Sequence, residues 1–303
     1  MHDDAVSSPP LIEVRGLVKR FGDKTVLAGV DLTIDRGETV AVIGGSGSGK
    51  STLARLIIGL DRVTSGQILL DGVDLAALGD EALAIFRRRF AMVFQRGALL
   101  DSLSVFDNVA FPLREETNLD AKTIRERVMM TLHELGVDGA EKLLPAQLSG
   151  GMAKRVSIAR AMVMEPEILV YDEPTSGLDP VSSRVVDGLI EQMRERFYVT
   201  SIVITHDMVS AYEISDRVVL LAGGKIVASG PPDQIFRSHS ESIAPFALAS
   251  GIDLDKLAPR AARPPPTEIQ ARWAAAHPPG SDPHQPWYVR LRAAAFQPPR
   301  SRD

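Results

Sequence analysis

Three short segments of this 303-residue chain place glycines, hydroxyls, a lysine and carboxylates in patterns that suit phosphate chemistry. Residues 44–51 read GGSGSGKS and match the spacing G-x-x-x-x-G-K-S/T, in which backbone N–H groups of a glycine-rich loop surround phosphate oxygens. Residues 148–152 read LSGGM, a turn of small residues ahead of a helical pattern. Residues 168–173 read ILVYDE, an apolar run that ends in two carboxylates. The first and last segments together predict a P-loop nucleotide site.

The glycine-rich loop has the flanking elements that such a site needs. Residues 39–43 are a continuous apolar run, typical of a strand in a buried parallel sheet, and residues 52–60 continue as a helix. The start of that helix adds partial positive charge to the loop. We expect Lys50 to reach the β- and γ-phosphates of ATP and the Ser51 hydroxyl to ligate Mg²⁺. Nucleotide contacts are expected from Gly44, Gly45, Ser46, Gly47, Ser48, Gly49, Lys50, Ser51 and Thr52.

Two carboxylates and a histidine follow further apolar runs. Asp172 closes the run that begins at residue 168 and is expected to hold Mg²⁺ through water. Glu173 is the candidate general base that polarises the attacking water. Residues 201–205 form another apolar run, which predicts a further strand of the same sheet and ends at His206. A lone histidine is commonly only a polar surface or core group, so its role stays open on the residues alone.

The three segments occur in the order found in ATP-binding cassette (ABC) transporter ATPases, and the chain resembles that family over about residues 11–236. Most family members read LSGGQ in the signature turn, whereas this chain reads LSGGM. The resemblance implies that the turn closes the nucleotide site of a second subunit, so that the chain works as a homodimer. The residues implied to contact the site of the partner chain are Ser149, Gly150, Gly151 and Asp179.

The resemblance also implies roles for three single side chains. Phe21 occupies a position that is more often Tyr, and its ring would stack on adenine, because Phe keeps the aromatic face. A core aromatic is an equal alternative for this residue on the sequence alone. Gln95 ends the apolar run 90–95 and would act as a hinge that contacts Mg²⁺ or the attacking water. His206 would contact the γ-phosphate and orient the water.

The fold implied is α/β: a P-loop NTPase of ABC type with a RecA-like parallel core sheet, an antiparallel β subdomain and an inserted helical subdomain. That helical subdomain is expected at about residues 96–164. The alternating pattern of residues 11–43 predicts antiparallel strands, and the periodicity of residues 123–135 predicts a helix, with another at residues 153–164. Three parts are expected: a flexible N-terminus over residues 1–10, an ATP-binding domain over residues 11–240, and a C-terminal arm over residues 241–303.

Residues 96–115 and residues 148–155 closely resemble the ATPase of Mce-type lipid-transport systems, the maintenance-of-lipid-asymmetry group. The resemblance implies that ATP hydrolysis drives movement of phospholipid or a related lipid between bacterial membranes. The implied partners are integral-membrane permease subunits and an Mce-domain substrate-binding protein, with the ATPase at the cytoplasmic face of the inner membrane. Two alternatives remain: an ABC ATPase for another cargo, such as polar amino acids, and a soluble ABC ATPase that acts on DNA or ribosomes.

Residues 96–114 mix apolar side chains with charges, as a partner surface does. We expect this segment to form the groove that receives a coupling helix of the permease. A plain core-and-loop segment is the alternative.

Composition narrows the class further. The chain has no cysteine, so it has no disulfide framework, and no apolar run of about 18 residues that could span a membrane. The net charge is −5, but residues 256–303 hold eight basic and three acidic residues and are therefore at +5, which leaves −10 on the rest. An acidic body argues against nucleic acid as a partner and leaves a basic arm as a contact element.

The arm is rich in proline as well as basic. Ten of the twenty prolines fall in residues 258–303, which predicts an extended or disordered segment without a core. The arm also carries Trp273, Trp287 and Tyr288, whose apolar faces gain little in water. The hypothesis is that the arm packs across the other ATPase subunit. The alternatives are a contact with anionic lipid and a tail without a role.

Overall fold

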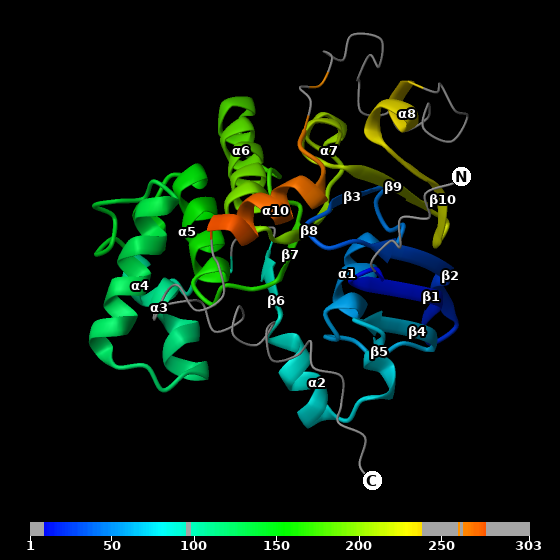
Figure 1. The fold of residues 1–303 in the computed structure, drawn as a ribbon, viewed down its shortest axis with the longest axis horizontal. Coiled ribbons are helices and arrows are strands. Elements are labelled where there is room, and N and C mark those ends of the chain that lie inside the picture. The colour runs from blue at the N-terminus through cyan, green and yellow to red at the C-terminus, as the bar shows by residue number, and fades with distance from the viewer. Residues whose placement is uncertain (1–8, 95–97, 238–259, 261–262, 277–303) are drawn as a thin grey trace.

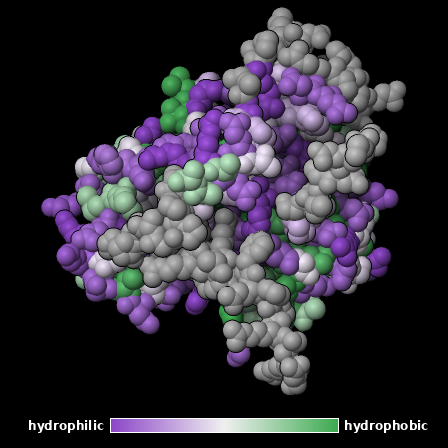
Figure 2. Space-filling view, viewed as in Figure 1, coloured by the Kyte–Doolittle hydropathy of each residue, from purple (hydrophilic) through white to green (hydrophobic). Residues whose placement is uncertain are grey.

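The computed structural model describes residues 9–94, 98–237, 260 and 263–276, which form two sheets and several helices (Figure 1). Gln95 and most of the arm, including Trp287 and Tyr288, lie outside the described residues, as does nearly all of the N-terminal segment expected to be flexible. Within the described ranges, no helix combines the length and the apolar character needed to cross a bilayer. The face seen in Figure 2 is mostly hydrophilic, with separate apolar areas.

The first sheet is antiparallel and follows the alternation seen in the sequence. Its strand order is β2-β1-β4-β5. The turn between its first two strands is at Gly22 and Asp23, and Gly22 has a φ of 56° that glycine adopts without strain. Its inward side chains enter a core shared with the second sheet. The strands are β1 (Ile12–Phe21), β2 (Lys24–Ile34), β4 (Ser65–Leu70) and β5 (Val73–Asp74).

The second sheet is parallel except at one edge, and its order is β10-β9-β3-β8-β7-β6. Both faces are covered, since alternate residues of one strand enter different cores: Ile168 and Val170 face the first sheet, and Leu169 and Tyr171 face the helices. This explains the continuous apolar runs in the sequence. The strands are β3 (Thr39–Ile43), β6 (Phe90–Val93), β7 (Ile168–Asp172), β8 (Thr200–Ile204), β9 (Arg217–Ala222) and the antiparallel β10 (Lys225–Gly230).

Helices cover the parallel sheet on both faces. Helix α1 packs in the core between the two sheets, and a helical layer lies on the other face (Figure 1). The α-helices are α1 (Lys50–Ile57), α2 (Asp80–Arg87), α3 (Val105–Glu116), α4 (Ala121–Glu134), α5 (Gly150–Met162), α6 (Pro180–Phe197), α7 (Met208–Ile214), α8 (Pro232–Arg237) and α10 (Pro266–Ala276). Short 3₁₀ turns are η1 (Leu75–Ala77) and η2 (Pro145–Gln147).

Local side-chain caps set where the helices of this layer begin. Ser104, Asp120 and Ser149 each precede a helix and accept a hydrogen bond from a backbone N–H in its first turn. The prediction that the third of these helices begins at Ala153 is therefore wrong by three residues. Helix α5 begins at Gly150, because the Ser149 hydroxyl accepts from the Met152 N–H at 3.3 Å.

The expectation that the arm is extended throughout is also wrong, because α10 is a helix. A proline is tolerated at the first helical position, and the alanines that follow favour a helix. Its Ile269 is only 2% exposed, and α10 contacts α6. Pro266 therefore begins a helix in the described part of the arm.

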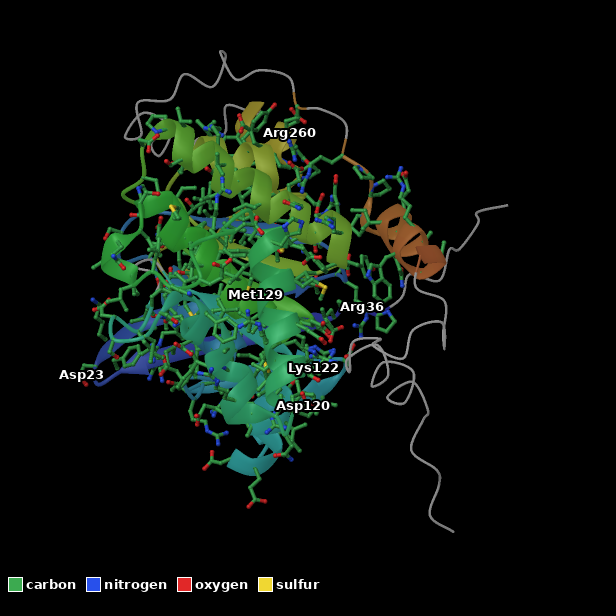
Figure 3. All side chains as sticks on the ribbon, turned by 90° about the vertical axis from the view of Figure 1, so that its left-hand side faces the viewer. Asp23, Arg36, Asp120, Lys122, Met129 and Arg260 are labelled. Carbon is green, nitrogen blue, oxygen red and sulfur yellow. The ribbon has the colours of Figure 1, made fainter. Side chains whose placement is uncertain are left out.

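The residues before α10 bind the same chain. Arg263 lies within ion-pair distance of Glu191 (2.8 Å) and Asp216 (3.3 Å), although the angles do not suit hydrogen bonds. The buried Arg194 donates to the Pro264 carbonyl at 2.9 Å. Arg260, labelled in Figure 3, donates to the Ser215 carbonyl at 2.5 Å, at the end of α7. The described part of the arm is thus held on α6 and α7 of its own chain.

Candidate nucleotide site

Three neighbouring strands bring the predicted site residues to one edge of the parallel sheet. In the order β3-β8-β7, the glycine-rich loop follows β3, His206 follows β8, and Glu173 follows β7. Because the strands are parallel, all three segments leave the sheet at its carboxyl edge, where ligands bind in open α/β folds. The strand beside β7 is β6. Gln95 comes two residues after the end of β6 in the sequence and lies outside the described residues.

Glycines are required at two positions of the loop over residues 44–51. Gly44 has a φ of 151°, and a Cβ there would lie 2.1 Å from the Leu221 carbonyl oxygen. Gly49 has a φ of 106°, and a Cβ would lie 2.7 Å from the Leu27 side chain. The loop backbone is therefore held close to β9 and β2. A side chain at either position would push the loop away from these strands.

Lys50 is held across the loop. Its ammonium group donates to the carbonyl oxygens of Gly44 at 2.8 Å and of Gly45 at 3.1 Å, and the side chain is buried. Burial lowers the pKa of Lys50, while the carboxylates Glu173 and Asp172 act in the opposite direction. A positive charge thus faces two negative charges across the site, at the place where an anionic phosphate would be bound.

A hydroxyl and a carboxylate meet where a divalent cation is expected. The Ser51 hydroxyl donates to the Asp172 carboxylate at 3.1 Å, across α1 and β7. Mg²⁺ prefers oxygen ligands of this kind, with waters and substrate phosphates completing its coordination. The donor set at this point therefore fits Mg²⁺.

Glu173 is fixed by its backbone and by a histidine. It has a φ of 52°, an uncommon left-handed conformation for a residue with a side chain, and its N–H donates to the Ile204 carbonyl at 2.8 Å. Its carboxylate lies 2.6 Å from Nδ1 of His206. The structure therefore brings together the predicted base and the predicted sensor in one hydrogen-bonded pair.

The signature turn packs against the segment that contains Asp179. A Cβ on Gly150 would lie 3.3 Å from Leu178, and one on Gly151 would lie 3.7 Å from Ser182. Asp179 caps α6, since its carboxylate accepts from the Val181 and Ser182 N–H groups, each at 3.0 Å. Ser149, Gly150 and Gly151 form the start of α5, and its free N–H groups suit an anion.

Phe21 is not a core aromatic, which excludes the alternative left open by the sequence. It ends β1 with 52% of its surface exposed, and the Lys19 ammonium lies 4.7 Å from its ring centroid. An exposed ring is available to stack on a planar base.

Sequence reasoning missed Lys154, which lies on α5. Its side chain is 6% exposed, and its ammonium group donates to the Phe94 carbonyl at 3.3 Å, next to Gln95. Burial lowers its pKa, and Asp172 and Glu173 oppose that shift, so it faces the same carboxylates as Lys50. The position carries no sequence signal of its own, because a lysine in an amphipathic helix is ordinarily a solvent-exposed residue.

Comparisons with known proteins agree with this geometry. The family model described as ABC transporter matches residues 27–176. The chain is 40% identical over 236 residues to the intermembrane phospholipid transport system ATP-binding protein MlaF of Haemophilus influenzae, covering 78% of this chain and 89% of that protein.

Solved structures give the same answer for the fold. CbiO1 of Clostridium perfringens, part of an ABC transporter complex, superposes with a TM-score of 0.71 at 32% identity, covering 80% of this chain and 96% of that one. A dimeric ATP-binding cassette in a post-hydrolysis state with ADP and phosphate superposes with a TM-score of 0.67 at 30% identity, covering 73% and 98%.

The sheet order, the glycine-rich loop and the paired carboxylates define a P-loop ATPase. The chain belongs to the ABC transporter family, as an ATP-binding and ATP-hydrolysing subunit. The family expectation and the α/β fold expectation drawn from the sequence are confirmed.

Proposed function

We propose that this chain hydrolyses ATP to drive the movement of phospholipid, or a related lipid, between bacterial membranes. The observation that carries the cargo assignment is the 40% identity that spans 89% of a phospholipid-transport ATP-binding protein. The proposed partners are permease subunits, an Mce-domain protein and a second copy of this chain. The proposed location is the cytoplasmic face of the inner membrane, through the permease.

The site residues take the following roles in this proposal. Lys50 and the loop N–H groups bind the phosphates of ATP, Phe21 stacks on the adenine, and Ser51 with Asp172 and Gln95 would hold Mg²⁺. The bound Mg²⁺ would neutralise charge on the phosphates. Glu173 accepts a proton from the attacking water, and His206, whose Nδ1 lies 2.6 Å from the Glu173 carboxylate, helps to orient that water. Ser149, Gly150, Gly151 and Asp179 contact the nucleotide site of the second copy.

Transport of lipid can be tested on the complex that purifies with the tagged chain. The complex is reconstituted into vesicles that contain a fluorescent phospholipid, and movement of the label is followed after addition of ATP or ADP. We expect the labelled phospholipid to move after addition of ATP but not after addition of ADP, because only ATP hydrolysis supplies the driving force. ATP hydrolysis without lipid movement, accompanied by uptake of a polar amino acid, would assign the chain to another cargo.

A second part of the proposal is that residues 96–114, of which the structure describes 98–114, receive the permease. Leu100 is 39% exposed, yet its backbone is fixed: the Asn108 amide accepts from the Leu100 N–H at 2.7 Å and donates to the Leu100 carbonyl at 3.0 Å. Asn108 also donates to the carbonyls of Leu103 and Ser104, each at 3.0 Å. An apolar side chain on a rigid loop is a suitable contact for a helix of a partner.

Leu100→Glu is therefore expected to weaken association with the permease by about tenfold or more, because a carboxylate would be buried without a partner. Co-purification of tagged chain and permease measures this, with ATP binding measured in parallel. Met130→Glu is the matched control, since Met130 is an exposed apolar residue of α4 outside the segment. Unchanged co-purification of the Leu100 variant would place the permease contact elsewhere.

A further inference from the structure

A cluster of two carboxylates and one hydroxyl joins α6 to the loop that carries His206, and its Asp207 is half-buried. Asp187 lies on α6 and is 4% exposed, and Ser210 lies in the first turn of α7 and is also buried. The Ser210 hydroxyl oxygen is 2.8 Å from Oδ2 of Asp187 and 3.0 Å from Oδ2 of Asp207. Asp207 is the N-cap of α7 and directly follows His206. None of the roles assigned above uses these three residues.

The number of protons shared by Asp187, Ser210 and Asp207 determines which of the two short contacts of Ser210 can be hydrogen bonds. A serine hydroxyl carries one hydrogen, and ionised carboxylates only accept hydrogen bonds. Ser210 can therefore donate to one carboxylate, and the second short contact becomes a hydrogen bond only if that carboxyl carries a proton. With a proton on one carboxyl, both contacts are satisfied.

The surroundings indicate which carboxyl carries the proton. Oδ1 of Asp207 accepts from the Val209 and Ser210 N–H groups at 3.0 and 3.1 Å, so this carboxyl already has two donors from the first turn of α7. Oδ1 of Asp187 is buried without a hydrogen-bond partner, which disfavours a charge there. Burial raises the pKa of Asp187 to about 6, with Ser210 acting in the opposite direction.

Three other charged groups face Asp187. Arg184, on the same helix, donates to Oδ2 of Asp187 at 3.3 Å and lowers the pKa of Asp187, but it also pairs with Glu213 of α7. The charges of Asp207 and Glu213 raise the pKa of Asp187. Strand β8, which α6 also contacts, carries no charged residue. The basic side chains of α5 donate to backbone carbonyls elsewhere; they are Lys154, Arg155 and Arg160. The two charged side chains of α10, Glu268 and Arg272, pair with each other.

We propose that Asp187 is a positioning residue for ATP hydrolysis, which holds the His206 loop through a hydrogen-bond chain from Asp187 through Ser210 to Asp207. In this chain the Asp187 carboxyl donates to the Ser210 hydroxyl, which donates to the Asp207 carboxylate. Asp207 then fixes the start of α7 and, with it, the position of His206 against Glu173. The inference rests on the proposed role of His206 and adds a link from α6, the helix that Asp179 caps.

The chain has a defined pH dependence. When Asp187 ionises, Ser210 can donate to only one of two carboxylates that now repel each other, so the His206 loop is held less firmly. The kcat for ATP is thus expected to fall as pH rises through the pKa of Asp187, about 6. Asp187→Asn keeps a donor at every pH, because its amide N–H₂ donates to Ser210 as the protonated carboxyl does.

The test compares kcat from pH 5 to pH 8 in the assembled transporter complex. At pH 5 we expect wild type and Asp187→Asn to be equal, and at pH 8 the Asn variant to be about 3- to 10-fold faster, the effect of one hydrogen bond. Asp187→Ala and Ser210→Ala should be slow at both values, with unchanged ATP affinity. Ser210→Ala leaves both carboxylates in place, so it tests the bridge even if the Asp187 variants fold poorly.

The outcomes separate this inference from the site assignment. If His206→Ala hydrolyses ATP at the wild-type rate, the proposed role of His206 is wrong. If His206→Ala is inactive while Asp187→Ala and Ser210→Ala match wild type at pH 5, where the wild-type chain is expected to be intact, only the positioning chain is wrong. Parallel pH profiles of wild type and Asp187→Asn would likewise overturn it.

Discussion

Glu173→Gln is expected to bind ATP with unchanged affinity and to hydrolyse it at least about 10²-fold more slowly than wild type. The substitution keeps the shape of the side chain, but it replaces one accepting oxygen with a donating amide group and so removes the group that accepts the proton of water. In the structure, this carboxylate lies beside His206 at 2.6 Å and follows a buried strand, so it is placed by the fold and not by chance. Phosphate release measures the rate, and nucleotide titration measures affinity.

The same variant is expected to accumulate as a dimer in the presence of ATP, because hydrolysis no longer separates the two copies. Size-exclusion chromatography with and without ATP reports this. Glu195→Gln is a suitable control, since Glu195 is an exposed carboxylate of α6. A Glu173→Gln complex with near-normal phosphate release would remove Glu173 from the role of base.

Lys50→Ala is expected to weaken ATP binding by about 10- to 100-fold, the range for loss of a hydrogen bond to a charged group. Lys50 is buried against the Gly44 and Gly45 carbonyls, and its charge faces Asp172 and Glu173. Without it, the phosphates meet two carboxylates whose charge is no longer balanced, so binding is lost along with hydrolysis.

Calorimetric titration with a non-hydrolysed ATP analogue separates this effect from the loss of rate. Lys122→Ala is the matched control, because Lys122 is an exposed lysine at the start of α4, away from the nucleotide loop (Figure 3). Undiminished affinity in the Lys50 variant would mean that the loop N–H groups alone bind the phosphates.

The sequence predicted the parts of this molecule that depend on local pattern. The apolar runs ending at residues 43, 172 and 204 became neighbouring parallel strands, and a glycine at 44 and at 49 was required by close backbone approach. The loop, Glu173 and His206 were each predicted to act on ATP or the attacking water, and they lie together because strand endings in a parallel sheet share one edge.

What the sequence did not predict depends on side chains that meet across elements. Lys154 reaches Phe94 over 60 positions, and Asp187 reaches Ser210 over 23, and neither distance is marked by a motif. Proline content favoured an extended arm, but residues 266–276 form a helix, because their alanines favour it and Ile269 is buried against the folded domain. Local propensity is a weak guide where tertiary contacts decide.

The contacts of Arg194 also set an order of assembly. This buried guanidinium donates to Gly37, to Asp216 and to Pro264, and Pro264 follows Arg194 by 70 positions in the chain. Chains fold as they emerge during synthesis, N-terminal parts first. The residues of both sheets, which end at Gly230, are therefore synthesised before the Pro264 carbonyl, the last of these acceptors to be made. A product that stops short of residue 264 leaves Nη2 of Arg194 with Asp216 alone, beside Nη1, which is buried without a hydrogen-bond partner among the described residues. Its abundance in the cell should fall accordingly.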